Sequence, residues 1–296
     1  MKKPRTWFEI LIWIAAFAAI ALTGTFLSPQ DEGKVDTGGE GKIVRLGYVS
    51  WAEGIAMTFL AEAVLEDRMG YDVELTMADP APIFTSLANG DLDFFLDAWL
   101  PVTHKPYMEK YGDRLVDLGH NYRGARIGLV VPAYLSISSI PGLAEKSQLF
   151  GGTITGIDSG AGIMVATRKA IEQYGLDMRL LTSSGAAMTA SLKDAIEARQ
   201  PIVVTGWKPH WMFARWDLKF LDDPRNVYGE VENIHTIARP DIQQDLPEVV
   251  NLFRRFMLTD KQIGTLMDAM NQAESQPAAA RGWMEEHADL VESWLK

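Results

Sequence analysis

The 296-residue chain contains no cysteine. Disulfide bonds, thiol nucleophiles, thiolate metal sites and a lipid-modified N-terminal cysteine are therefore excluded. A basic excess is also missing, because 28 Lys and Arg face 39 Asp and Glu, which gives a formal net charge of −11. A nucleic-acid partner requires a basic footprint, so we expect none. The five histidines show no metal-ligand spacing, and we expect neither a metal site nor a cofactor.

Long apolar runs are absent beyond the first 27 residues. At the start, a basic stretch at residues 2–5 (KKPR) precedes an uncharged apolar run at residues 10–27. This arrangement predicts a secretory signal peptide or a membrane anchor in residues 1–27, with the remainder exported. A buried core helix is the alternative interpretation. Residues 28–42 are rich in glycine and charge, which predicts a flexible linker.

From residue 43 the sequence alternates between strand-like and helix-like patterns, and alternation of this kind implies parallel sheets with helices on both faces. We expect strands at residues 44–49, 71–75, 92–96, 114–118, 127–132, 154–157, 179–182 and 201–205. We expect helices at residues 55–68, 81–87, 104–111, 162–174, 189–199, 245–256, 259–270 and 278–295.

This order of elements predicts two lobes with a ligand cleft between them. We expect lobe 1 at residues 43–124 and lobe 2 at residues 125–212. Residues 213–296 would then form a helical tail that returns to lobe 1.

Three of the predicted strands run into a tryptophan: Trp51, Trp99 and Trp207. In open α/β sheets, ligands bind beyond the carboxyl ends of the strands. Tryptophan faces attract cations, so we expect these three rings to form a cage around a cationic ligand. The alternative is burial in the core, which is the interpretation we favour for four other tryptophans: Trp211, Trp216, Trp283 and Trp294.

Residues 156–163 (GIDSGAGI) join a predicted strand to a predicted helix. The N–H groups in the first turn of a helix favour an anion, and glycine lets a ligand approach the backbone. A simple tight turn is the alternative interpretation. A quaternary ammonium has no N–H to donate, so a ligand that also carries a carboxylate would use both the cage and this helix start.

Four segments, taken in order, resemble one known family: residues 47–53 (GYVSWAE), 97–104 (DAWLPVTH), 156–163 and 206–213 (GWKPHWMF). They are similar to the substrate-binding proteins of glycine betaine/proline betaine/choline ABC transporters. The C-terminal residues 283–295 also fit this family. The resemblance implies a type II periplasmic-binding-protein fold, in which two mixed sheets flanked by helices form two lobes around a ligand cleft.

The resemblance also implies residue roles. By match of motif, Trp51, Trp99 and Trp207 form the aromatic cage. The backbone N–H groups of Gly162 and Ile163 hold the carboxylate of the ligand.

Three further residues match the family less closely. His104 resembles the side-chain donor to the carboxylate, although it could simply open a helix. Glu53 lies where choline-selective relatives place an acidic ligand contact, although a solvated first-turn carboxylate is the simpler interpretation. Tyr122 lies where some relatives place a fourth aromatic.

These features predict a non-enzymatic binding protein that captures a quaternary ammonium compatible solute, with glycine betaine favoured, for osmoprotectant uptake. It would dock on an inner-membrane ABC permease driven by a separate ATPase. It would be periplasmic, either soluble after cleavage or tethered by residues 10–27. Alternatives are a choline- or carnitine-binding protein of the same class, a sensor domain, and a secreted hydrolase of choline esters. For a hydrolase, Ser159 lacks the Gly-x-Ser-x-Gly pattern.

Overall fold

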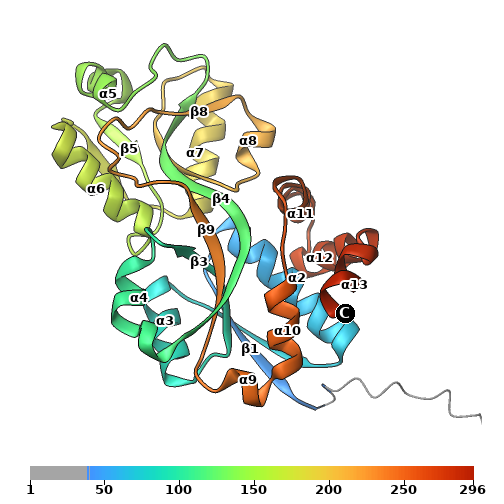
Figure 1. Cartoon of the computed structure of the whole chain (residues 1–296). Coiled ribbons are helices and arrows are strands. Elements are labelled where there is room, and N and C mark those ends of the chain that lie inside the picture. Colours follow the sequence, from blue (N-terminus) through green and yellow to red (C-terminus); the bar gives the residue numbers. More distant parts are fainter. Residues whose placement is uncertain (1–38, 40) are drawn as a thin grey trace, which may run out of the picture. The chain divides into compact units, whose positions relative to one another are not determined.

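The computed structural model describes residue 39 and residues 41–296 (Figure 1). The predicted signal or anchor, residues 1–27, lies outside the described residues, as does nearly all of the predicted linker at residues 28–42. Within the described part, no helix combines the length and the apolar character that a membrane span requires.

The strands of the described part form a nine-stranded sheet in the order β2-β1-β3-β9-β4-β7-β5-β6, with β8 paired to β4. The strands are β1 (Ile43–Tyr48), β2 (Asp72–Met77), β3 (Phe94–Leu100), β4 (Val116–Pro132), β5 (Thr153–Thr155), β6 (Arg179–Leu181), β7 (Val204–Lys208), β8 (Leu218–Phe220) and β9 (Glu232–Ala238).

Parallel and antiparallel pairs occur in both halves of this sheet. In the first half, β1 runs parallel to β2 and β3, while β9 runs antiparallel to β3 and β4. In the second half, β5 runs parallel to β6 and β7, while β4 runs antiparallel to β7 and β8. The mixed sheets implied by the family resemblance are therefore present, and the purely parallel sheets inferred from alternation are wrong. The antiparallel pairs come from β9 in the first half and from β4 with β7 and β8 in the second, and neither β8 nor β9 was predicted from the sequence.

Strand β4 is continuous, although the sequence pattern predicted two separate strands at residues 114–118 and 127–132. Its first part pairs with β9, and from Arg126 onward it pairs with β7. Register shifts interrupt the pairing with β9, and Gly119 and Gly124 lie within them at φ 103° and 86°. Such positive φ angles suit glycine, so the irregular part of the strand coincides with the gap between the two predicted strands.

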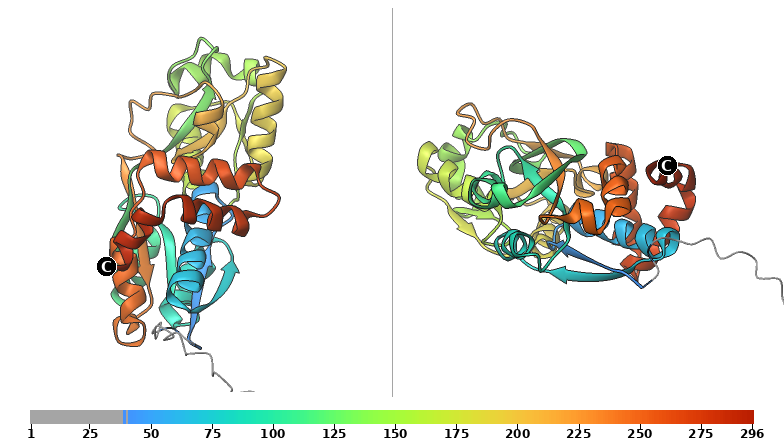
Figure 2. Two further views of the ribbon diagram at one scale, coloured as in Figure 1. Left: turned by 90° about the vertical axis from the view of Figure 1, so that its right-hand side faces the viewer. Right: turned by 60° about the horizontal axis from the view of Figure 1, so that its bottom comes forward.

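Helices cover the sheet on both sides, as the alternating pattern predicted (Figures 1 and 2). The helices are α2 (Ala52–Met69), α3 (Pro80–Asn89), α4 (Lys105–Tyr111), α5 (Pro141–Lys146), α6 (Gly162–Tyr174), α7 (Gly185–Glu197), α8 (Met212–Arg215), α9 (Ile242–Asp245), α10 (Pro247–Arg255), α11 (Asp260–Gln272), α12 (Gln276–Glu286) and α13 (Ala288–Leu295). Short 3₁₀ turns, η1 (Gly112–Arg114) and η2 (Ser147–Phe150), follow α4 and α5.

The C-terminal helices pack against the first half of the sheet. Helices α11 and α12 lie across α2, and α10 contacts β4 and α13 (Figure 2). Trp283 on α12 and Trp294 on α13 are buried, so their predicted core role is confirmed. The single helix predicted at residues 278–295 is wrong, because His287 leaves helical geometry at φ −119° and ψ 33° and separates α12 from α13.

The predicted lobe boundaries at residues 124 and 212 stay a prediction. Strand β4 continues across the first boundary, from pairing with β9 to pairing with β7. Beyond the second boundary, β8 still pairs with β4 in the second half of the sheet, and β9 is the strand that returns to the first half.

Candidate functional site

A small buried pocket brings together the three tryptophans predicted to form a cage. Trp51 immediately precedes α2, Trp99 is the next-to-last residue of β3, and Trp207 is the next-to-last residue of β7. All three are buried, and the pocket between them has an empty volume of about 260 Å³. The rest of the lining comprises Glu53, Thr103, Ile127, Ile157, Ala161, Gly162 and Ile163.

The second half of the sheet contributes the start of helix α6 to this pocket. Ala161 precedes the helix, and Gly162 and Ile163 begin it. The first-turn N–H groups of a helix have no intrahelical acceptor, so this end favours an anion. A side chain at Gly162 would collide with the methyl group of Thr103 and come within 3.0 Å of the Thr103 carbonyl oxygen. Glycine therefore permits the close approach of α6 to the segment that follows β3.

Each of two cage tryptophans donates its indole N–H to a buried carboxyl group. Trp99 Nε1 donates to Asp97 Oδ1 at 2.8 Å, and Trp207 Nε1 donates to Glu53 Oε2 at 2.6 Å. These bonds fix the planes of the rings. Burial raises the pKa of Glu53, and burial together with the charge of Glu53 raises the pKa of Asp97 well above its usual range. Near the third ring, burial and the charge of Asp79 raise the pKa of Asp158.

His104 is fully buried behind the cage, with its ring stacked on Trp51 at a centroid distance of 6.0 Å. The backbone N–H of Trp99 donates to His104 Nδ1 at 2.9 Å. Burial lowers the pKa of His104 to about 3, so the ring is neutral and carries its proton on Nε2. Nε2 has no hydrogen-bond partner among the described residues. His104 therefore offers a free N–H donor next to the pocket, although it is not part of the lining.

Tyr122, like His104, is a predicted site residue that does not line the pocket. Its side chain is buried, and its hydroxyl donates to Asp260 Oδ1 at 2.6 Å. The residue lies in β4, opposite Ile234 of β9. A fourth aromatic contact from Tyr122 has no support in this geometry.

Glu232, which was not predicted as a site residue, positions the segment that carries Thr103 and His104. Its Oε2 accepts the backbone N–H groups of Val102 and Thr103 at 2.8 and 2.7 Å, and its Oε1 accepts the Thr103 hydroxyl. Glu232 begins β9, the strand that the sequence pattern did not reveal, so no signal pointed to it. Asp97 and Thr103 were overlooked as individuals, although both lie inside the quoted 97–104 motif.

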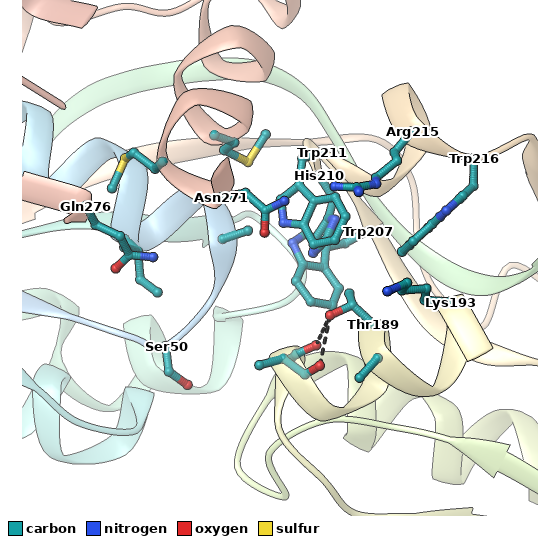
Figure 3. Close-up of a pocket in the computed structure, with 17 residues that line it drawn as sticks. Ser50, Thr189, Lys193, Trp207, His210, Trp211, Arg215, Trp216, Asn271 and Gln276 are labelled. Carbon is teal, nitrogen blue, oxygen red and sulfur yellow. Dashed lines mark hydrogen bonds between the residues drawn. The ribbon is translucent and has the colours of Figure 1, made fainter. Parts of the chain in front are cut away.

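A second, larger cavity shares Trp207 as a wall and has an empty volume of about 1090 Å³, including open solvent (Figure 3). Its lining includes Trp211, Trp216, Lys193 and Arg215. Trp211 and Trp216 are thus half-buried edges of a cavity, where the sequence predicted core residues. Across the described residues, no cluster of side chains suits a metal ion.

Comparison with known proteins decides the family. The family described as the substrate-binding domain of ABC-type glycine betaine transport systems matches residues 42–286. The chain belongs to this family. The resemblance drawn from the four sequence segments is therefore confirmed, and so is the expectation that the fold serves a transport binding protein.

Individual relatives agree with this assignment. The glycine betaine/carnitine transport binding protein GbuC of Listeria monocytogenes is 49% identical over 145 residues, which span 48% of this chain and 48% of that protein. The match therefore spans about half the length of that relative. The glycine betaine-binding periplasmic protein OusX of Dickeya dadantii is 25% identical over 95% of this chain and 96% of its own length.

Solved structures confirm the predicted fold class, the mixed α/β architecture of type II periplasmic-binding proteins. Lactococcal OpuAC, in its closed conformation with glycine betaine, is 38% identical with a TM-score of 0.81, covering 86% of this chain and all (100%) of that one. An ABC-transporter choline-binding protein in complex with choline is 27% identical with a TM-score of 0.79, covering 86% of this chain and 91% of that one.

Proposed function

We propose that the protein binds a quaternary ammonium solute, with glycine betaine favoured, in the pocket between Trp51, Trp99 and Trp207. One observation carries the proposal: three indole rings from distant parts of the chain line a single pocket. Each tryptophan face attracts a cation by about 0.5–2 kcal/mol, and more where water is excluded. A methylated ammonium, which has no N–H to satisfy, suits such a site better than a primary amine does.

The start of α6 and His104 supply the complementary end of the site. The N–H groups of Gly162 and Ile163 and the free Nε2–H of His104 are donors suited to a carboxylate. A micromolar complex requires about 8 kcal/mol, which is more than three ring contacts of ordinary strength supply. A zwitterion that uses both ends therefore fits the site better than a simple cation does.

Choline or carnitine is the second candidate ligand. Glu53 lines the pocket, and its Oε1 has no partner among the described residues. A carboxyl oxygen in this position complements choline, which has no carboxylate of its own, whereas carnitine carries one and would also use the donors at the start of α6.

We propose binding without catalysis. The hydroxyl in the pocket lining, that of Thr103, donates to Glu232. The nearby His104 uses Nδ1 to accept the Trp99 N–H, so it cannot accept a proton from a nucleophile at that atom. A nucleophile paired with a base, which a hydrolase of choline esters needs, is not formed by these groups.

In this proposal the protein delivers its ligand to an inner-membrane ABC permease driven by a separate ATPase, for osmoprotectant uptake. It acts in the periplasm, either free or tethered by residues 10–27. Ligand contacts from both halves of the sheet would stabilise a closed form that the permease recognises, because a ligand shifts an equilibrium by its differential affinity for the two states.

Isothermal titration calorimetry with glycine betaine, carnitine and choline tests the proposal. The matched control ligand is tert-butylacetate, which replaces the quaternary nitrogen of glycine betaine with carbon and keeps its shape and carboxylate. We expect glycine betaine to bind with a dissociation constant on the order of micromolar and the carbon analogue to bind at least about a hundredfold more weakly. Equal affinities for the two, or no binding of any methylated amine, would overturn the proposal.

A further inference from the structure

Two carboxyl groups lie buried under the cage, and both are only half satisfied. Glu53 and Asp97 are 0% and 1% exposed. One oxygen of each accepts an indole N–H, from Trp207 and Trp99 respectively. The other oxygen of each, Glu53 Oε1 and Asp97 Oδ2, has no hydrogen-bond partner among the described residues. A buried oxygen in this state is costly unless a proton or a cation accompanies it.

The two groups are neighbours. A Cβ atom on Gly54, the residue after Glu53, would lie 2.6 Å from Asp97 Oδ2. The free oxygen of Asp97 therefore lies against the backbone that carries Glu53. Two ionised carboxylates at such close quarters repel each other, and burial disfavours both charges, so such a pair retains a proton.

No cationic side chain lines the pocket, and neither carboxyl group forms a salt bridge with any residue in the range 41–296. Of the other titratable groups nearby, buried His104 is neutral because its pKa is lowered to about 3. Tyr122 is also neutral, because burial, Asp260 and Glu53 raise its pKa above its usual range. Asp158, beside Trp51, adds negative rather than positive charge when ionised. The described protein thus holds an acidic pair without a counter-ion.

We propose that Glu53 and Asp97 act as one proton-sharing pair, and that a quaternary ammonium entering the cage displaces a proton from this pair and becomes its counter-ion. The inference rests on the proposed function, because it requires a cation in the cage. The released proton passes from a carboxyl oxygen to water. The pair gains one negative charge, which the positive charge of the ligand balances.

The sign of the linkage follows from this balance. The empty site holds the proton, and the occupied site does not, so binding tightens as pH rises while the empty pair remains protonated. If one proton is released per ligand, the association constant rises about tenfold per pH unit. This rise of the association constant with pH should be larger for choline than for glycine betaine. The carboxylate of glycine betaine offsets part of the positive potential that its ammonium group produces at Glu53 and Asp97.

Calorimetry of the full-length protein with choline, in two buffers of different ionisation enthalpy, measures the proton release directly. We expect an apparent binding enthalpy that differs between the buffers, in the direction of proton release. The choline dissociation constant, measured between about pH 6 and about pH 9, should fall as pH rises. A flat pH profile together with equal enthalpies in both buffers would overturn the inference.

Matched variants separate a charge effect from a structural one. Glu53→Gln and Asp97→Asn retain an oxygen that accepts the indole N–H, so the cage geometry is preserved while the titrating carboxyl is removed. We expect each single change to reduce the proton release and the double change to abolish most of it and to flatten the pH profile, because burial alone still raises the pKa of a remaining carboxyl group. Glu109→Gln is the control, because Glu109 is exposed on a helix and pairs with Lys105. This change should leave the proton release and the pH profile of binding unchanged.

The results of these experiments separate a failure of the proton-release inference from a failure of the proposed ligand-binding function. If the wild-type protein binds glycine betaine and choline without exchanging protons, the inference is wrong and the proposed function stands. If no methylated amine binds at any pH, the proposed function fails, and the inference fails with it. Should both variants fail to fold, the two-buffer experiment on the wild-type protein still decides the question.

Discussion

The backbone N–H of Trp99 donates to Nδ1 of His104 at 2.9 Å, while the indole N–H of the same tryptophan donates to Asp97 at 2.8 Å. One residue thus fixes a cage ring with its side chain and a histidine tautomer with its main chain. Because Nδ1 is the acceptor, the proton of the neutral ring lies on Nε2, where it has no partner among the described residues. The proposed carboxylate donor and the proposed cation cage are therefore positioned together.

Replacing His104 with alanine should weaken glycine betaine binding far more than choline binding. A hydrogen bond to a charged group contributes about 1.5–3 kcal/mol, so we expect a loss of roughly tenfold to a hundredfold for glycine betaine. Choline has no carboxylate and should lose less than about threefold. Calorimetric titration of both ligands measures the ratio, and equal losses for the two would contradict the role of Nε2–H.

Replacing Trp51 with leucine should reduce the affinity for every quaternary ammonium ligand. The loss of one tryptophan face costs about 0.5–2 kcal/mol, so we expect a loss of roughly twofold to thirtyfold, and Trp51→Phe should recover part of it. Trp216→Leu is the matched control, because Trp216 lines the larger cavity and not the cage. Intrinsic fluorescence or calorimetry measures the ligand affinity of each variant. If Trp216→Leu lost as much affinity as Trp51→Leu, the prediction would be wrong.

Replacing Gly162 with alanine should weaken both ligand binding and the fold. The new methyl group would collide with that of Thr103, across the approach between α6 and the segment after β3, at a cost of about 1–3 kcal/mol. We expect a loss of affinity of roughly tenfold or more, together with a lower free energy of unfolding in urea, because the clash lies within the folded protein.

Two further variants make this test specific. Thr103→Ser removes the obstructing methyl group and retains the hydroxyl that donates to Glu232, so it should restore binding in the Gly162→Ala background. Gly264→Ala is the control, because a Cβ there meets nothing within 4 Å. It lies in α11 and should stabilise the protein by about 0.5–1 kcal/mol at unchanged affinity. If the serine change fails to rescue binding, the steric explanation is wrong.

Acid should destabilise the protein through two buried histidines. Burial lowers the pKa of both His104 and His210 to about 3. Below the ordinary histidine pKa of about 6.5, the unfolded chain gains protons that the folded protein does not bind. Their contribution to stability is therefore complete above about pH 6.5 and is lost as pH falls from there toward about pH 3.

His210→Gln measures this contribution. We expect the variant to show a shallower loss of unfolding free energy on acidification, by up to about 1.4 kcal/mol per pH unit. Urea unfolding at a series of pH values gives the slopes. Parallel slopes for wild type and His210→Gln would contradict the prediction.

The sequence alone predicted the elements whose signals are local. The Gly162–Tyr174 helix was predicted with its observed bounds, because a glycine-rich turn and a 3.6-residue periodicity mark it in consecutive residues. Trp51, Trp99 and Trp207 were predicted to converge because each lies at a strand end, and strand ends share an edge of the sheet.

The features that were overlooked depend on contacts distant in the chain. The sequence of β9 (ENIHTIA) lacks the polar and apolar alternation of a half-buried strand, and the place of β9 between β3 and β4 is set by pairing with residues more than a hundred positions away. The role of Glu232 could not be predicted for the same reason, because its partners Val102 and Thr103 are distant from it in sequence. Tyr122 matched a family position only loosely, and bulges in β4 direct its hydroxyl to Asp260.

Strand β4 runs unbroken from Val116 to Pro132 through both halves of the sheet. A continuous backbone of this kind links the two halves directly, and its irregular peptide at Gly124 lies next to the point where β4 changes partner from β9 to β7. A change in the angle between the two halves therefore requires this strand to bend. The resistance of β4 to bending should therefore influence the rate at which a ligand is released from the pocket.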